Sequence, residues 1–152
     1  MARYKLIMNP LAGRGRAEEL LPIALELLRQ EGITPDVTRT THHLHAIELT
    51  KRAAAEGYDV ILTMGGDGTA NEVINGLMAA YRGDPVGTLG MLPAGSGNDF
   101  CVAIDWPTEI AEACKRIGAG QDRLIDVGRL NDRFFGNAVG IGFDAIAHIE
   151  AA

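Results

Sequence analysis

The sequence has few cysteines and no long hydrophobic run. Cys101 and Cys114 are its two cysteines, far apart and in no CxxC spacing, which argues against a disulfide framework or a zinc ribbon. The apolar run near the N-terminus stops at Asn9 and Pro10, too short for a signal-peptide core or a membrane span. We therefore expect a cytoplasmic protein whose contact with lipid, if it has any, is peripheral and at the inner face of the membrane.

The chain also lacks an excess of positive charge. Its formal net charge is -6, so the field of the whole protein does not attract nucleic acid, anionic lipid or nucleotide. Nucleic acid is not an expected partner, and any bound anion must be held by local donors. Apolar residues make up 47% and charged residues 22% of the 152 residues, a composition typical of one globular domain with a sizeable core.

Short apolar runs alternate with stretches of helical periodicity. The patterns predict strands over 4–8, 34–40, 60–64 and 86–92, and helices over 17–31, 45–56, 69–81, 98–103 and 108–117. Strands separated by helices indicate an α/β fold, a doubly wound parallel sheet with right-handed crossovers.

The last part of the sequence has a different pattern. The segments 124–130 and 133–141 flank Asn131 and Asp132, a two-residue linker suited to a type I′ hairpin. We therefore expect an α/β domain over 1–122 and the beginning of an antiparallel β domain over 123–152.

Ligands of open parallel sheets bind beyond the carboxyl ends of the strands, here after Met8, Met64 and Leu92. Met64 is followed by Gly65 to Thr69 (GGDGT) and then by a helix. Backbone N–H groups without neighbouring side chains, beside a helix N-terminus, suit phosphate oxygens. We therefore predict that this loop binds phosphate.

Asp67 is the charged residue of the GGDGT loop. A carboxylate beside polyphosphate is costly unless it holds Mg²⁺ or takes a proton, so Asp67 is the first catalytic candidate. The alternative is an N-cap for the helix expected near Thr69. The three glycines around Asp67 favour the catalytic interpretation.

The loops after Leu92 and Met8 leave alternatives open. Ser96 can donate to a phosphate, but Ser96 or Asn98 can equally cap the following helix. After Met8, Arg14 or Arg16 can neutralise phosphate, and the alternative is that both are solvated surface arginines.

Other motifs would indicate other classes of protein. There is no GxxxxGK[ST] segment, and Gly140 to Ala145 matches GxGxxA without room for an acidic ribose ligand about twenty residues further on. We interpret that match as chance. His42, His43 and His45 have no further Cys or carboxylate at ligand spacing, so a polar loop is favoured over a metal site.

Three segments together resemble the diacylglycerol kinase catalytic domain family: 9–13 (NPLAG), 65–69 with 71–76 (GGDGT and NEVING), and 92–100 (LPAGSGNDF). This family includes bacterial lipid kinases and sphingosine kinases, and is similar in fold to NAD kinases and phosphofructokinases, which share the GGDGT loop alone. The resemblance implies that ATP and Mg²⁺ are cofactors, and that the ATP γ-phosphate is transferred to a hydroxyl of diacylglycerol or a related lipid.

The resemblance also implies which residues form the site. Asp67 is the expected essential carboxylate, and Asp99 and Asp144 are expected to approach the substrate. The expected nucleotide contacts are Asn9, Gly13, Thr40, Gly65, Gly66, Asp67, Gly68, Thr69, Ala70, Asn71, Gly95, Ser96 and Asn98.

The sequence departs from the family pattern in two ways. Leu44 stands where a glycine is usual, and the family normally continues with a β-rich domain that supplies lipid and metal contacts. Without that domain, the hairpin of 124–141 has open strand edges, which favour a homo-oligomer. The alternatives to an active lipid kinase are a non-catalytic nucleotide-binding fragment that needs a second domain, and a soluble-substrate kinase related to NAD kinase.

Overall fold

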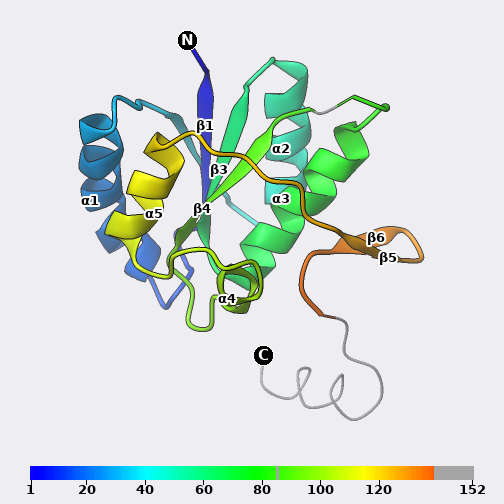
Figure 1. Cartoon of the computed structure of the whole chain (residues 1–152). Helices are drawn as coiled ribbons and strands as arrows, with labels where there is room; N and C mark the ends of the chain where they lie inside the picture. Colours follow the sequence, from blue (N-terminus) through cyan, green and yellow to red (C-terminus); the bar gives the residue numbers. More distant parts are fainter. Residues whose placement is uncertain (85, 139–152) are drawn as a thin grey trace.

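The computed structural model describes residues 1–84 and 86–138. Four strands form a parallel sheet in the order β2-β1-β3-β4, and β5 and β6 form a separate antiparallel pair (Figure 1). In chain order the elements are β1 (Tyr4–Met8), α1 (Arg16–Gln30), β2 (Asp36–Arg39), α2 (His45–Ala55), β3 (Val60–Gly65), α3 (Asp67–Ala80), β4 (Thr88–Pro93), α4 (Asp99–Ala103), α5 (Ile110–Gly118), β5 (Gly128–Leu130) and β6 (Arg133–Phe135).

The central strands are apolar on both faces because helices cover both sides of the sheet. Side chains alternate along a strand, so Leu6 and Met8 of β1 face one layer and Ile7 faces the other. The first layer contains α1 and α5, and the second contains α2 and α3 (Figure 1).

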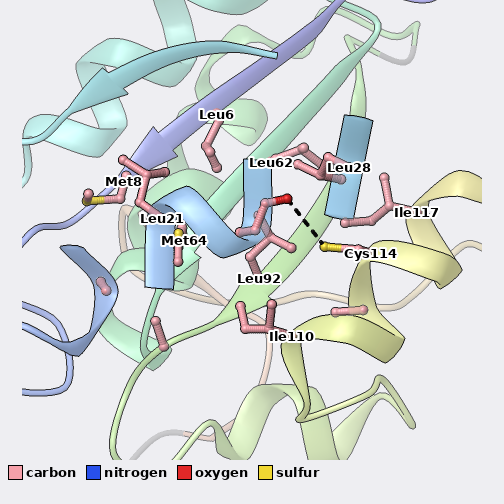
Figure 2. Close-up of a cluster of buried hydrophobic side chains, with 14 of the residues drawn as sticks. Leu6, Met8, Leu21, Leu28, Leu62, Met64, Leu92, Ile110, Cys114 and Ile117 are labelled. Carbon is pink, nitrogen blue, oxygen red and sulfur yellow. Dashed lines mark hydrogen bonds between the residues drawn. The ribbon is translucent and has the colours of Figure 1, made fainter. Parts of the chain in front are cut away.

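The larger core cluster lies between the sheet and the layer of α1 and α5 (Figure 2). Its leucines, methionines and isoleucines are nearly inaccessible to solvent, and the thiol of Cys114 donates to the Ala24 carbonyl at 3.8 Å. Burial raises the pKa of the Cys114 thiol to about 11. This cysteine is therefore a packing residue rather than a nucleophile.

The predicted architecture is confirmed, while several boundaries differ. The strand expected over 34–40 is shorter, Asp36–Arg39, and that expected over 86–92 is shifted to Thr88–Pro93. The helix expected from Thr69 begins at Asp67, because Gly66 is the last residue with an extended backbone. These differences move Asp67 from a loop into the first turn of a helix.

The antiparallel hairpin is much shorter than expected. Only Gly128–Leu130 and Arg133–Phe135 pair, whereas 124–141 was the expected extent, and its last residues, 139–141, lie outside the described part of the chain. Leu124 is fully exposed, so no packed surface supports a longer strand there. The hairpin contacts α3 (Figure 1), and a domain boundary after residue 122 stays a prediction.

Across the described residues, no helix has both the length and the apolar character that crossing a bilayer requires.

Candidate functional site

Three loops meet at the carboxyl ends of β1, β3 and β4, the end of the sheet beside α4 in Figure 1. The loop after β1 reaches the loop after β4, because a Cβ on Gly13 would collide with the Ala94 carbonyl oxygen. It also reaches α3, since the Asn9 side-chain amide donates to Thr69 Oγ1 at 3.3 Å. The parallel register brings these distant segments together, as the sequence predicted.

The GGDGT loop is a tight strand-to-helix connection. Gly65 ends β3, and a Cβ there would lie 2.5 Å from Thr69 Oγ1, so only glycine fits over the threonine side chain. Gly66 lies against Gly95, whose Cα is 3.1 Å from the position of a Gly66 Cβ. The GGDGT loop and the loop after β4, which we call the two glycine loops, are therefore in backbone contact. The N-terminus of α3 lies beside them.

The carboxylate of Asp67 joins the two glycine loops. Its Oδ1 accepts a hydrogen bond from the Phe100 backbone N–H at 2.7 Å, and its Oδ2 accepts one from the Asp99 N–H at 3.1 Å. Asp67 thus caps the N-terminus of α4, whereas the sequence alternative was a cap for its own helix, which has no side-chain cap. Both carboxylate oxygens hold the turn that follows β4.

Asn98 stabilises the second glycine turn instead of capping α4. Its Oδ1 accepts from the Gly95 N–H and its Nδ2 donates to the Gly95 carbonyl, both at 3.0 Å. Asn98 itself has a left-handed backbone, with φ of 58°. The capping alternative for Asn98 is therefore wrong, because its amide is used within the turn and Asp67 occupies the cap.

The loops enclose a cleft of about 400 Å³. Of the predicted nucleotide contacts, those that line it are Asn9, Gly13, Gly66, Gly68, Thr69, Asn71, Gly95 and Ser96. Within the described structure, those that stand outside its walls are Thr40, Gly65, Asp67, Ala70 and Asn98. The walls also include residues that the sequence did not single out as site residues: Ala12, His43, Leu44, Glu72 and Arg133.

Glu72 is a site residue that sequence reasoning missed. Its carboxylate accepts from the backbone N–H groups of Leu44 and Ala46, both at 3.1 Å, and lies 3.6 Å from His43 Nδ1. Glu72 therefore caps α2 from α3 and fixes the rim of the cleft. Its position one turn after Thr69 was a signal that it faces the same way.

Leu44 adopts a left-handed conformation with φ of 64° at the N-cap of α2. This conformation explains why the family pattern has glycine at that position. Nearby, the imidazoles of His42 and His45 stack at 4.3 Å, and His45 Nδ1 accepts from the Thr41 N–H. The histidines thus belong to a polar loop at the start of α2.

The profile of the diacylglycerol kinase catalytic domain matches residues 3–130. The chain belongs to this family. The chain is 38% identical over 143 residues to a diacylglycerol kinase of Bacillus subtilis, covering 93% of the chain and 46% of that protein. With a diacylglycerol kinase of Staphylococcus carnosus the identity is 35%, covering 89% of the chain and 43% of the relative.

The fold of the diacylglycerol kinase family is shared as well. The crystal structure of a diacylglycerol kinase from Bacillus anthracis superposes with a TM-score of 0.76 at 31% identity, covering 88% of this chain and 45% of that one. The chain thus spans about half the length of the relatives that it matches.

Of the two predicted substrate contacts, Asp99 lies outside the walls of the cleft. A Cβ on Gly97 would be 3.4 Å from Asp67 Oδ2 and 3.5 Å from Asp99 Oδ2, so these two carboxylates approach the same turn. Asp144 lies outside the described residues. No three His, Cys, Asp or Glu side chains of the described part are grouped to hold a metal. A Mg²⁺ ion often uses one or two carboxylates plus substrate phosphates. The carboxylates of Asp67 and Asp99 are compatible with that pattern.

Cys101 belongs to α4 and is buried. Burial, with the negative charge of Asp67 as a smaller cause, raises the pKa of the Cys101 thiol to about 11. Cys101 is therefore protonated at neutral pH and is not a candidate nucleophile of this kinase-family member.

Proposed function

We propose that the chain is the nucleotide-binding part of a lipid kinase that transfers the γ-phosphate of ATP to a hydroxyl of diacylglycerol or a related lipid. The observation that carries the proposal is the cleft in which the N-terminus of α3 and the glycine backbones of Gly66, Gly68 and Gly95 converge. The first N–H groups of a helix have no partner within it. They therefore offer donors to phosphate oxygens.

The cleft supplies positioning groups for phosphoryl transfer. Asn71 and Ser96 line it with an amide and a hydroxyl, and Thr69 is held by the Asn9 amide. Because catalysis of phosphoryl transfer depends mainly on position and charge, preformed donors of this kind fit the reaction. Thr40, Gly65, Ala70 and Asn98 lie outside the walls of the cleft and stay proposed contacts of the nucleotide.

Asp67 is the proposed essential carboxylate. Both of its carboxylate oxygens accept backbone N–H groups, which fixes the orientation in which it would act as a base or hold a metal-bound water. The lipid oxygen attacks the γ-phosphorus, the bond to the β–γ bridging oxygen breaks, and the hydroxyl proton leaves by or through Asp67. Mg²⁺, when bound with ATP, neutralises charge on the β- and γ-oxygens.

The lipid site is proposed to involve Asp99, Asp144 and a β-rich domain that begins near residue 123. The relatives are about twice as long as this chain, which supports a cleft completed by a further domain. The open edge of β5 and β6 then pairs with that domain or with a second copy of the chain. We propose action in the cytoplasm, with peripheral contact at the inner face of the membrane.

A second candidate is a nucleotide-binding fragment that does not catalyse transfer by itself. The coverage of about half of each relative favours it. A kinase for a soluble substrate such as NAD is the third alternative, and it is disfavoured by the match to the diacylglycerol kinase profile.

The test is transfer of labelled γ-phosphate from Mg-ATP to diacylglycerol, monoacylglycerol, phosphatidylglycerol, sphingosine and NAD, with the chain and with Asp67→Asn. Labelled lipid that disappears with Asp67→Asn supports the lipid kinase and names its substrate. Labelled NAD supports the third alternative. Binding of ATP without any labelled product supports the nucleotide-binding fragment, and absence of ATP binding contradicts all three.

A further inference from the structure

The cleft contains very little positive charge for a site that would hold a polyphosphate. The protein carries a formal net charge of -6, and Glu72 brings a carboxylate to the cleft wall. Arg133 is the one arginine or lysine among the described residues that line the cleft. Arg14 and Arg16, which the sequence suggested as phosphate ligands, are exposed and outside these walls in the described structure.

The position of Arg133 is fixed by hydrogen bonds of the next residue. Asn75 of α3 accepts from the Phe134 N–H at 2.9 Å and donates to the Phe134 carbonyl at 2.9 Å. The Asn71 side chain donates to the same carbonyl at 3.1 Å. We call this arrangement the asparagine clamp, formed by Asn71 and Asn75 around the Phe134 backbone.

Packing supports the asparagine clamp. Phe134 packs against the buried cluster that includes Ile74 and Phe100. A Cβ on Gly136 would lie 2.7 Å from the Phe100 ring and 2.8 Å from Ile74 Cδ1, so the chain after β6 lies directly on this cluster. The backbone next to Arg133 is therefore held by both hydrogen bonds and apolar contact, which limits the positions that its side chain can reach.

Arg133 also has no competing carboxylate partner in the described structure. The neighbouring Asp132 pairs with Arg129 at 3.6 Å, and the ion pairs found among the described residues do not include Arg133. An arginine that lines a cleft and has no anionic partner is suited to bind phosphate, because the N–H groups of a guanidinium match two phosphate oxygens.

We propose that Arg133, placed by the asparagine clamp, binds a phosphate group of the nucleotide in the cleft. The inference rests on the proposed function, since it assumes that the cleft binds a nucleotide. It assigns a nucleotide contact to the hairpin, which lies outside the segments that suggested the site from the sequence. The β5–β6 hairpin is then part of the nucleotide site as well as the start of a further domain.

The test compares the affinities of ATP, ADP and adenosine, measured by calorimetry with Mg²⁺ present, for the wild-type chain, Arg133→Gln, Arg133→Lys and Arg123→Gln. Arg123 is exposed and outside the cleft walls in the described structure, so Arg123→Gln controls for the change in net charge. We expect Arg133→Gln to weaken ATP and ADP roughly tenfold or more, as for the loss of a charged hydrogen-bonded contact. Adenosine affinity should be unchanged, Arg133→Lys should be intermediate, and Arg123→Gln should match the wild type.

The failures of the two proposals are distinguishable. If the wild type binds neither ATP nor ADP, the proposed function is contradicted. If the wild type binds ATP and Arg133→Gln binds it equally well, the assignment of Arg133 is overturned while the proposed function stands. Equal weakening of ATP and adenosine also overturns it, because Arg133 would then act through the shape of the site and not on phosphate.

Discussion

Two hollows of similar volume lie at opposite ends of the parallel strands. The cleft at the carboxyl ends measures about 400 Å³, and the hollow at the amino ends of β3 and β4 measures about 470 Å³. The second is lined by the end of α2 and by residues such as Tyr58, Asp59 and Thr88. Size therefore does not distinguish the candidate site from an ordinary surface hollow.

The polarity of the helices distinguishes the two ends. The cleft opens at the N-terminus of α3, which carries a partial positive charge, whereas the hollow lies beside the C-terminal end of α2, which carries a partial negative charge. Asp59 adds a further negative charge to the hollow. The helix ends therefore favour a phosphate at the first location over the second, although Arg3 and Lys5 lie over the Tyr58 ring at the second.

Backbone strain is also greater in the loops at the carboxyl ends of the strands than in those at the amino ends. Arg14, Leu44 and Asn98 have positive φ in the loops at the carboxyl ends, whereas the left-handed residues before β2 and β3 are Gly32 and Gly57. A left-handed conformation costs a residue with a side chain about 1–2 kcal/mol. The protein tolerates this cost where the loops form the candidate site.

Gly95→Ala should have the largest effect, and it should disrupt the loops at the carboxyl ends of the parallel strands. The new methyl group would collide with Gly66 Cα and lie 3.1 Å from Gly66 N, which forces the two glycine loops apart. We expect a loss of about 1–3 kcal/mol in the free energy of unfolding and a loss of ATP affinity of roughly tenfold or more, measured by urea titration and calorimetry. At the amino end, Gly57→Ala has a positive φ but room for the methyl group, so it should lower stability and leave ATP affinity unchanged. Equal ATP binding by both variants would contradict the comparison.

Asp67→Asn and Asp59→Asn form a matched pair of variants at opposite ends of β3. Both aspartates accept backbone N–H groups: Asp67 from Asp99 and Phe100, and Asp59 from Arg3 at 2.7 Å. We expect Asp67→Asn to cost about 1–2 kcal/mol and to abolish any phosphoryl transfer. Asp59 is exposed, so Asp59→Asn should cost less and leave transfer intact. Similar transfer rates for the two variants would show that Asp67 has no special role.

Leu44→Gly should stabilise the protein while Leu44→Ala should not. Glycine removes the strain of the left-handed conformation, and alanine keeps that strain while losing part of the side-chain packing. We expect a gain of up to about 1 kcal/mol for glycine, read from the urea midpoint of each variant. A Leu44→Gly protein no more stable than Leu44→Ala would mean that the rim is not strained.

Tyr58→Phe should have the smallest effect and be confined to the amino end. The Tyr58 hydroxyl donates to Asp36 Oδ2 at 2.5 Å, and this hydrogen bond, followed by burial, raises the pKa of Tyr58. Because the folded protein holds this proton more tightly than the unfolded chain does, the contribution is fully present below about pH 10 and is lost as pH rises through the raised pKa. The stability difference between wild type and Tyr58→Phe should therefore shrink as the pH rises above about 10. A constant difference, or altered ATP affinity, would contradict this assignment.

The parts of the fold that sequence reasoning predicted are local. Apolar runs such as Ile61 to Met64 and the glycine turns after them indicate their own structure, and the rule for parallel sheets then brings the turns together. The approach of Gly66 to Gly95 follows from this topology. The order of the strands, β2-β1-β3-β4, was not predicted, because the alternation of strands and helices indicates a parallel sheet but not the order of its strands.

The parts that were not predicted depend on contacts between distant segments. Asp67 binds residues 32 and 33 positions away, and Asn75 binds Phe134, 59 positions away. No periodicity in the sequence reports these pairs, because each depends on how two elements pack. The position of Arg133 at the cleft follows from such a contact and was missed for that reason.

The position of Asp67 affects how an inactive control protein should be made. A substitution there changes the support of α4 and of the turn after β4 as well as any chemistry of the carboxylate. An inactive Asp67 variant is therefore an adequate chemical control only if its affinity for ATP and its melting temperature are close to those of the wild type. Otherwise a loss of phosphoryl transfer would reflect a displaced loop, and a conservative change at the exposed residue Ser96 disturbs the architecture less.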